Sequence, residues 1–224
     1  MKFFIDTADI NQIEEINSLG LVDGVTTNPS LIYKSGRDFK KVISDISKIV
    51  TGPISAEVTT KNFEDMVSQG LELAKIAHNI VVKVPLTEQG LRACKELSNR
   101  NIKVNVTLCF SSSQALLAAK MGASYISPFI GRLDDISHDG LDLIKDIVKI
   151  YHNFKDTLKT EVLVASIRSP LQISKTALMG AHVATIPPKI IKQMINHPLT
   201  DIGLESFMKD WGKTGQKFWL RKKI

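Results

Sequence analysis

Short runs of β-branched and other apolar residues alternate along the chain with longer stretches in which apolar residues recur at helical spacing. The runs predict strands at residues 2–5, 24–27, 54–58, 80–84, 103–108, 125–129, 161–165 and 183–186. The stretches after them predict helices at residues 8–18, at segments ending near 50, and at 62–77, 88–98, 112–121, 138–152, 170–178 and 188–195. Eight strand–helix units in succession predict an α/β fold, a (β/α)8 TIM barrel.

A doubly wound sheet is the competing architecture, and it usually carries a glycine-rich phosphate loop after its first strand. Here that position holds Asp6-Thr7-Ala8-Asp9, in which Asp9 or Thr7 can cap the next helix. The barrel is therefore preferred. A chain of 224 residues with 43% hydrophobic content can bury one large core. We expect one domain over residues 1–224, with the barrel at about 1–197 and an additional C-terminal helix and tail at about 198–224.

The last predicted helix, at about 201–211, and the tail after it carry much apolar surface. The large side chains are Phe207, Trp211, Phe218 and Trp219. This surface can pack on the protein's own barrel or on a neighbouring subunit, and the sequence leaves both open.

Lys83 interrupts the apolar run Ile80-Val81-Val82-Lys83-Val84-Pro85. An unpaired buried ammonium is costly, so a lysine in such a run tends to lose its proton and become a nucleophile toward carbonyl groups. The alternative is an edge-strand lysine with its amine in water. Strand residues alternate in direction, so Lys83 shares a face with Val81 while Val82 and Val84 face the helices. By the same alternation, Asn105 and Thr107 point inward and Leu108 outward.

Polar residues recur at the carboxyl ends of six successive strands, which meet at one mouth in a barrel. Each has an ordinary explanation alone, such as a helix cap or a turn residue, but together they predict an active site. They are Asp6, Asn28, Glu57, Lys83, Thr107 and Ser127, with Phe129 beside the last. Arg132, Ser166 and Arg168 follow strands six and seven and can clamp a phosphate, although surface ion pairs are the common role of isolated arginines. Their place beside Lys83 favours a phosphorylated sugar.

Charge and composition narrow the function. The net charge of +6 comes from 29 Lys and Arg spread along the chain, with a local run only at residues 221–223, so nucleic-acid binding is not favoured. No signal peptide and no apolar stretch of membrane-spanning length is apparent, which predicts a soluble, cytoplasmic protein without membrane partners. Cys94, Cys109 and the five histidines lack metal-ligand spacing, so no metal is expected.

Several segments closely resemble the transaldolase family, in particular its short, single-barrel branch. They are Gly24-Val25-Thr26-Thr27-Asn28-Pro29-Ser30, Val82-Lys83-Val84-Pro85, Asn105-Val106-Thr107 and Ile126-Ser127-Pro128-Phe129-Ile130-Gly131-Arg132, and the resemblance runs from Phe3 to about Trp211. It implies a class I aldolase-type barrel that transfers a dihydroxyacetone unit from sedoheptulose 7-phosphate or fructose 6-phosphate to an aldose phosphate. It also implies a Schiff base on Lys83, the non-oxidative pentose phosphate pathway, no cofactor, and a ring-type homo-oligomer, such as a decamer.

The resemblance also implies roles for individual residues. Glu57 and Thr107 would move protons through a water during imine formation, and Asp6 would take the proton of the C4 hydroxyl. Asn28, Asn105 and Ser127 would bind substrate hydroxyls, and Arg132, Ser166 and Arg168 the phosphate.

The short branch also resembles fructose-6-phosphate aldolases, which cleave the ketose and release free dihydroxyacetone. Those aldolases carry glutamine at the position of Glu57, tyrosine at that of Phe129, and other residues in place of Asn105 and Thr107, so the transferase is preferred. A phosphosugar-binding barrel without chemistry is a remote alternative.

Overall fold

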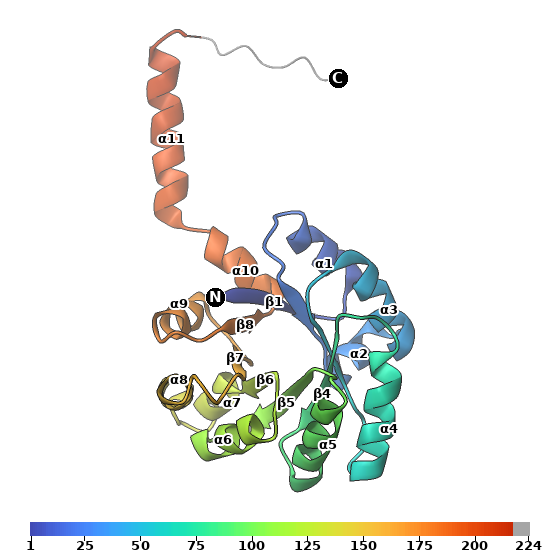
Figure 1. The fold of residues 1–224 in the computed structure, drawn as a ribbon. Helices are drawn as coiled ribbons and strands as arrows, with labels where there is room; N and C mark the ends of the chain where they lie inside the picture. Colours follow the sequence, from blue (N-terminus) through green and yellow to red (C-terminus); the bar gives the residue numbers. More distant parts are fainter. Residues whose placement is uncertain (217–224) are drawn as a thin grey trace.

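A computed structural model describes residues 1–216 and contains a closed barrel of eight parallel strands (Figure 1). The strands are β1 (Lys2–Asp6), β2 (Gly24–Thr26), β3 (Ile54–Glu57), β4 (Ile80–Pro85), β5 (Val104–Cys109), β6 (Tyr125–Pro128), β7 (Glu161–Val164) and β8 (Val183–Ile186). They pair in chain order, and β8 closes the barrel against β1 through Lys2 opposite Val183. The TIM barrel is confirmed, and the doubly wound sheet is excluded.

Helices surround the barrel in sequence order (Figure 1). They are α1 (Ile10–Asn17), α2 (Pro29–Ser35), α3 (Phe39–Ile49), α4 (Phe63–Ala74), α5 (Glu88–Asn99), α6 (Ser112–Lys120), α7 (Ile130–Asp134), α8 (Gly140–Asn153), α9 (Pro170–Leu178) and α10 (Pro188–Ile195). Asp9 caps α1 by accepting hydrogen bonds from the backbone N–H groups of Asn11 and Gln12. Of the two predicted caps, Asp9 and Thr7, the structure therefore shows Asp9. The short helix α7, which follows β6 directly, was not predicted.

The alternation predicted for β4 is observed. Val82 and Val84 lie in the large core between barrel and helices, whereas Val81 packs inside the barrel with Phe4, Tyr125, Leu163 and Val183. This inner apolar layer fills the barrel on the amino-terminal side of Lys83. The prediction for Leu108 was wrong. Its φ of 60° lies at a register shift between β5 and β6, and Cys109 enters the outer core instead.

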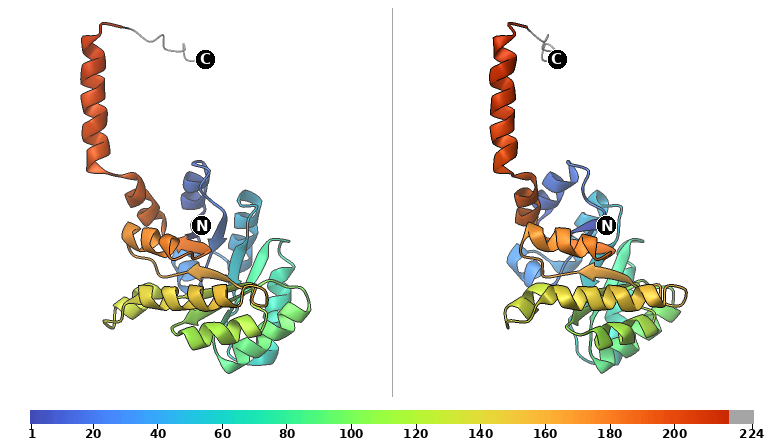
Figure 2. Two further views of the ribbon diagram at one scale, coloured as in Figure 1. Left: turned by 60° about the vertical axis from the view of Figure 1, so that its left-hand side comes forward. Right: turned by 90° about the vertical axis from the view of Figure 1, so that its left-hand side faces the viewer.

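The last described helix, α11 (Pro198–Lys213), projects away from the barrel (Figures 1 and 2). It buries none of its residues, and large apolar side chains are exposed along it, namely Leu199, Ile202, Leu204, Phe207 and Met208. The described part of this helix therefore does not use the protein's own barrel as a packing surface. Phe218, Trp219 and the basic run at 221–223 lie outside the described residues. Among the described helices, none combines the length and apolar character needed to cross a bilayer.

Candidate active site

A polar cavity of about 180 Å³ opens among the carboxyl ends of the strands. Its lining consists of Asp6, Thr26, Asn28, Lys83, Ser127, Phe129, Arg132, Ala165, Ser166 and Thr185. Seven of these residues were predicted as site residues from the sequence. A larger hollow of about 540 Å³ lies alongside, between the β1–α1 loop and α2, and shares Asp6 with the cavity. The smaller cavity is the candidate site because Lys83 and Asp6 line it, whereas Glu57, Asn105 and Thr107 are not among its lining residues.

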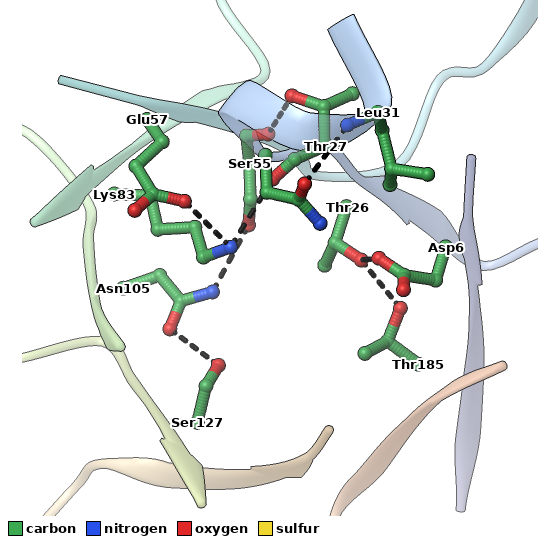
Figure 3. A network of polar contacts seen from close by, with 11 residues as sticks. Asp6, Thr26, Thr27, Leu31, Ser55, Glu57, Lys83, Asn105, Ser127 and Thr185 are labelled. Carbon is green, nitrogen blue, oxygen red and sulfur yellow. Dashed lines mark hydrogen bonds and ion pairs between the residues drawn. The ribbon is translucent and has the colours of Figure 1, made fainter. Parts of the chain in front are cut away.

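Lys83 lies inside the barrel and is almost fully buried, with 5% of its side chain exposed. β3 and β4 place Glu57 directly opposite Lys83, and Glu57 Oε2 is 2.9 Å from Lys83 Nζ (Figure 3). The same amine donates a hydrogen bond of 3.1 Å to the carbonyl oxygen of Thr27. The edge-strand interpretation is therefore wrong. The amine lies among polar partners rather than in the wholly apolar surroundings that the strand sequence suggested, and the carboxylate can accept its proton.

A second set of hydrogen bonds links Ser55 on β3 to Asn105 on β5 and Ser127 on β6 (Figure 3). Asn105 Nδ2 donates to Ser55 Oγ at 3.2 Å, and Ser127 Oγ donates to Asn105 Oδ1 at 2.7 Å. All three side chains are buried. The network fixes the orientation of the Asn105 amide and of the Ser127 hydroxyl. Of the two, only Ser127 lines the cavity.

Asp6 lies at the end of β1 and accepts a hydrogen bond of 2.8 Å from Thr26 Oγ1, which is 2.5 Å from Thr185 Oγ1 (Figure 3). Burial raises the pKa of the Asp6 carboxyl above its ordinary value, while the Thr26 hydrogen bond and the positive charge of Lys83 act in the opposite direction. A carboxylate with a raised pKa is a stronger base, which suits proton abstraction.

Thr107 and Asn28 differ in their hydrogen bonding and in their access to the cavity. Thr107 Oγ1 is buried and has no hydrogen-bond partner within residues 1–216, so its donor and acceptor capacity is available to a water or a substrate. The Asn28 side chain accepts a hydrogen bond of 3.0 Å from Leu31 N and caps α2, and it also lines the cavity. Its role as a helix cap and its place in the site are therefore compatible.

The cationic end of the cavity lies at β6 and β7. Arg132 Cζ is 5.1 Å from the ring centroid of Phe129, and Ser166, at φ 61°, lines the cavity beside them. Arg168 does not line the cavity. Its guanidinium forms a two-pronged ion pair with Asp135, in which Nη2 is 2.6 Å from Oδ2. For Arg168, the structure thus shows the surface ion pair that was the alternative to phosphate binding.

Sequence reasoning missed Thr26, Ser55 and Thr185. Thr26 binds Asp6 and Ser55 binds Asn105, while Thr185 binds Thr26. Strand alternation could have found them, because Thr26 follows the outward Val25, Ser55 shares the face of Glu57, and Thr185 that of the inward Val183. Asp135 could not be found in this way, since it lies 33 residues before its partner in the sequence and outside any strand.

The described residues contain no group of three or more His, Cys, Asp or Glu that could hold a metal ion. Cys94 and Cys109 are buried, and burial raises the pKa of each thiol to about 12. Neither thiol is a nucleophile at neutral pH.

Known proteins match nearly the whole chain. A family model described as Transaldolase/Fructose-6-phosphate aldolase covers residues 3–218. A protein named probable transaldolase from Paracoccus denitrificans is 61% identical over 217 residues, which are 97% of this chain and 99% of the relative. A protein of the same name from Jannaschia sp. is 60% identical, and the match covers 96% of this chain and 99% of the relative. Another from Cereibacter sphaeroides is 58% identical, and the match covers 99% of this chain and 100% of the relative.

Proposed function

The chain belongs to the transaldolase/fructose-6-phosphate aldolase family, and we propose that it is a transaldolase that transfers a dihydroxyacetone unit through a Schiff base on Lys83. One observation supports this proposal most directly. The amine of Lys83 is buried, is 2.9 Å from a carboxylate, and opens into a cavity that also contains Asp6 and Arg132. A nucleophile, a base and a cation for a phosphate thus surround one space of sugar size.

Imine formation begins when Glu57 takes a proton from Lys83, because only the neutral amine can attack the C2 carbonyl of the ketose phosphate. The resulting carbinolamine loses its hydroxyl as water when a proton is returned to it. A water between Glu57 and Thr107 would relay these protons. The unpaired, buried hydroxyl of Thr107 supports this role, since a bound water would satisfy it.

Cleavage of the sugar needs a base and an electron acceptor. Asp6 takes the proton of the C4 hydroxyl, the C4 oxygen becomes the aldehyde oxygen, and the electrons of the broken C3–C4 bond neutralise the iminium as an enamine. The raised pKa of Asp6 supports its role as the base. The aldose phosphate leaves, and an acceptor aldose phosphate reacts with the enamine by the same steps in reverse.

Binding of the substrate is assigned to the remaining polar groups. Asn28, Asn105 and Ser127 would bind the hydroxyl groups of the three-carbon unit, and the hydrogen bonds between Ser127 and Asn105 support this because they orient both groups. Arg132, Ser166 and Arg168 would bind the phosphate. Sedoheptulose 7-phosphate and fructose 6-phosphate are the proposed donors, in the non-oxidative pentose phosphate pathway, and no cofactor is needed because the iminium accepts the electrons.

Two further features belong to the proposal. The exposed apolar side chains of α11 support a homo-oligomer in which this helix packs on a neighbouring subunit, with a ring as the form that the resemblance implies. We also assign the protein to the cytoplasm, where this chemistry would find its substrates.

The experiment is incubation with fructose 6-phosphate and borohydride, with and without erythrose 4-phosphate, followed by mass analysis of the Lys83 peptide and of the products. We expect borohydride to trap a three-carbon adduct on Lys83. Sedoheptulose 7-phosphate should form only when the acceptor is present. Lys83→Met should abolish both. Rapid release of free dihydroxyacetone without acceptor would instead indicate the aldolase. Absence of any adduct, or an adduct retained in Lys83→Met, would overturn the assignment of Lys83.

A further inference from the structure

The carboxylate of Asp135 occupies the edge of Arg168 that a phosphate would use. Both terminal nitrogens of the guanidinium bind it, Nη1 to Oδ1 and Nη2 to Oδ2, the latter at 2.6 Å. Carboxylates and phosphates present the same pair of oxygens to a guanidinium, so one edge cannot bind both at once.

The remaining edge of Arg168 is not open to a ligand. A Cβ added at Gly131 would lie 2.6 Å from Arg168 Nε. The Nε side of the guanidinium therefore lies directly against the backbone of α7. Arg168 therefore has to leave Asp135 before it can bind a phosphate in the bidentate manner.

The loop that carries Arg168 is held without Asp135. Arg168 N donates to Gln172 Oε1 at 2.8 Å, and Gln172 Nε2 donates to Asp134 Oδ2 at 2.7 Å. Asp134 Oδ1 also accepts a hydrogen bond of 3.0 Å from Gly140 N. The backbone hydrogen bond from Gly131 N to Ser166 O and the side chains of Asp134 and Gln172 thus hold α7 to the β7–α9 loop, whereas the Asp135 side chain binds only the guanidinium of Arg168.

We propose that Asp135 is a specificity-determining residue that competes with the substrate phosphate for Arg168. This inference rests on the proposed function, because it assumes that Arg168 reaches the phosphate. Arg132 and Ser166, which already line the cavity, would meet the phosphate first, and Arg168 would then exchange Asp135 for it. The Asp135–Arg168 pair is half exposed, with side-chain exposures of 49% and 51%. When Arg168 leaves, the Asp135 carboxylate is therefore solvated by water and is not left as an unpaired buried charge. Competition of this kind weakens the retention of every phosphorylated ligand, including products.

The test compares Asp135→Asn with the wild type. Asparagine keeps the shape but forms no ion pair, so Arg168 becomes available. Because exposed ion pairs contribute up to about 1 kcal/mol, we expect inorganic phosphate to bind about two- to fivefold more tightly in low-salt calorimetry. The KM for fructose 6-phosphate should fall by a similar factor, while that for unphosphorylated fructose should stay unchanged. Weaker or unchanged phosphate binding in Asp135→Asn would overturn the proposal.

Two controls isolate the cause. Glu96→Gln removes one negative charge from another exposed arginine–carboxylate pair, Glu96 with Arg100, and should leave phosphate binding unchanged. In an Arg168→Ala background, Asp135→Asn should have no effect, and a gain that persists there would overturn competition for Arg168. Phosphate titration does not need Schiff-base chemistry, so a failure of the proposed function would appear in the borohydride experiment while this test still reports on Asp135.

Discussion

The buried carboxyl group of Asp6 couples activity to stability at a single residue. Burial raises its pKa, so the folded state favours the protonated form. The stability that this group contributes is therefore fully present below the pKa of the unfolded chain, about 4, and is lost as pH rises through the higher pKa of the folded state. At neutral pH, the charged form of Asp6 that the proposed mechanism requires is therefore a cost to the fold.

Asp6→Asn should remove this cost and also stop cleavage. We expect the variant to be more stable at pH 7–8 by on the order of 1 kcal/mol, or about 2–4 °C in Tm, with a smaller gain at pH 4.5. Thermal unfolding at several pH values measures this, with the exposed Asp146→Asn as a control that should show no such gain. Borohydride should trap the whole six-carbon ketose phosphate on Lys83. A gain that grows toward acid pH would contradict the assignment.

Phe129 is the second residue at which the reaction outcome can be changed. Its ring lines the cavity beneath Arg132 and carries no proton donor. Phe129→Tyr should add a hydroxyl that can protonate the enamine, and release of free dihydroxyacetone without acceptor should rise at least about tenfold, within the range of positioned acid catalysis. A coupled assay for dihydroxyacetone measures this. Phe110→Tyr is the matched control. Phe110 packs edge-on against Phe129, with 6.1 Å between the ring centroids, and does not line the cavity. Equal release by both variants would contradict the prediction.

Among the elements, α7 carries Arg132 and packs against the loop that carries Ser166 and Arg168, so it positions the groups that are proposed to bind the phosphate. Gly131 N donates to Ser166 O at 3.1 Å, and an added Cβ would collide with that carbonyl and with Arg168 Nε. Gly131→Ala should therefore push α7 away from the β7–α9 loop, destabilise the fold by roughly 1–3 kcal/mol, and raise KM for fructose 6-phosphate more than for fructose. Urea unfolding and steady-state kinetics test this. Gly203→Ala on α11, where a Cβ meets nothing within 4 Å, should not destabilise the protein.

The same elements show how far sequence reasoning reaches. The succession of eight strand–helix units predicted the barrel. Strand alternation predicted the inward faces of β4 and β5 up to Thr107, because a closed sheet leaves each side chain only two directions. It failed at Leu108, where a residue with positive φ breaks the period. The five-residue helix α7 gave no usable pattern, since it is too short for helical periodicity and has no side-chain cap. Pairings such as Arg168 with Asp135 depend on the relative placement of two loops, which no local pattern encodes.

For the whole molecule, α11 stands away from the barrel (Figure 2), and its large apolar side chains are exposed. Leu204, Phe207 and Met208 recur at helical spacing, and Phe207 is 75% exposed. A single chain would keep this surface in water, whereas a second copy could bury it. The cavity lies at the strand ends and none of its lining residues comes from α11, so assembly and catalysis can be tested separately.

Phe207→Asp should therefore disrupt assembly without unfolding the barrel. A charge in the middle of a buried apolar contact is costly, so we expect the wild type to elute as an oligomer and the variant as smaller species in size-exclusion chromatography with light scattering. Far-UV circular dichroism should stay unchanged, and borohydride should still trap the three-carbon adduct on Lys83, because that lysine lies inside its own barrel. Lys209→Asp, which places the same acidic group at a charged position of the same helix, should leave the oligomer intact. An unchanged oligomer in Phe207→Asp would exclude this part of α11 from the contact, whereas loss of the adduct together with the oligomer would mean that the neighbouring subunit completes the active site.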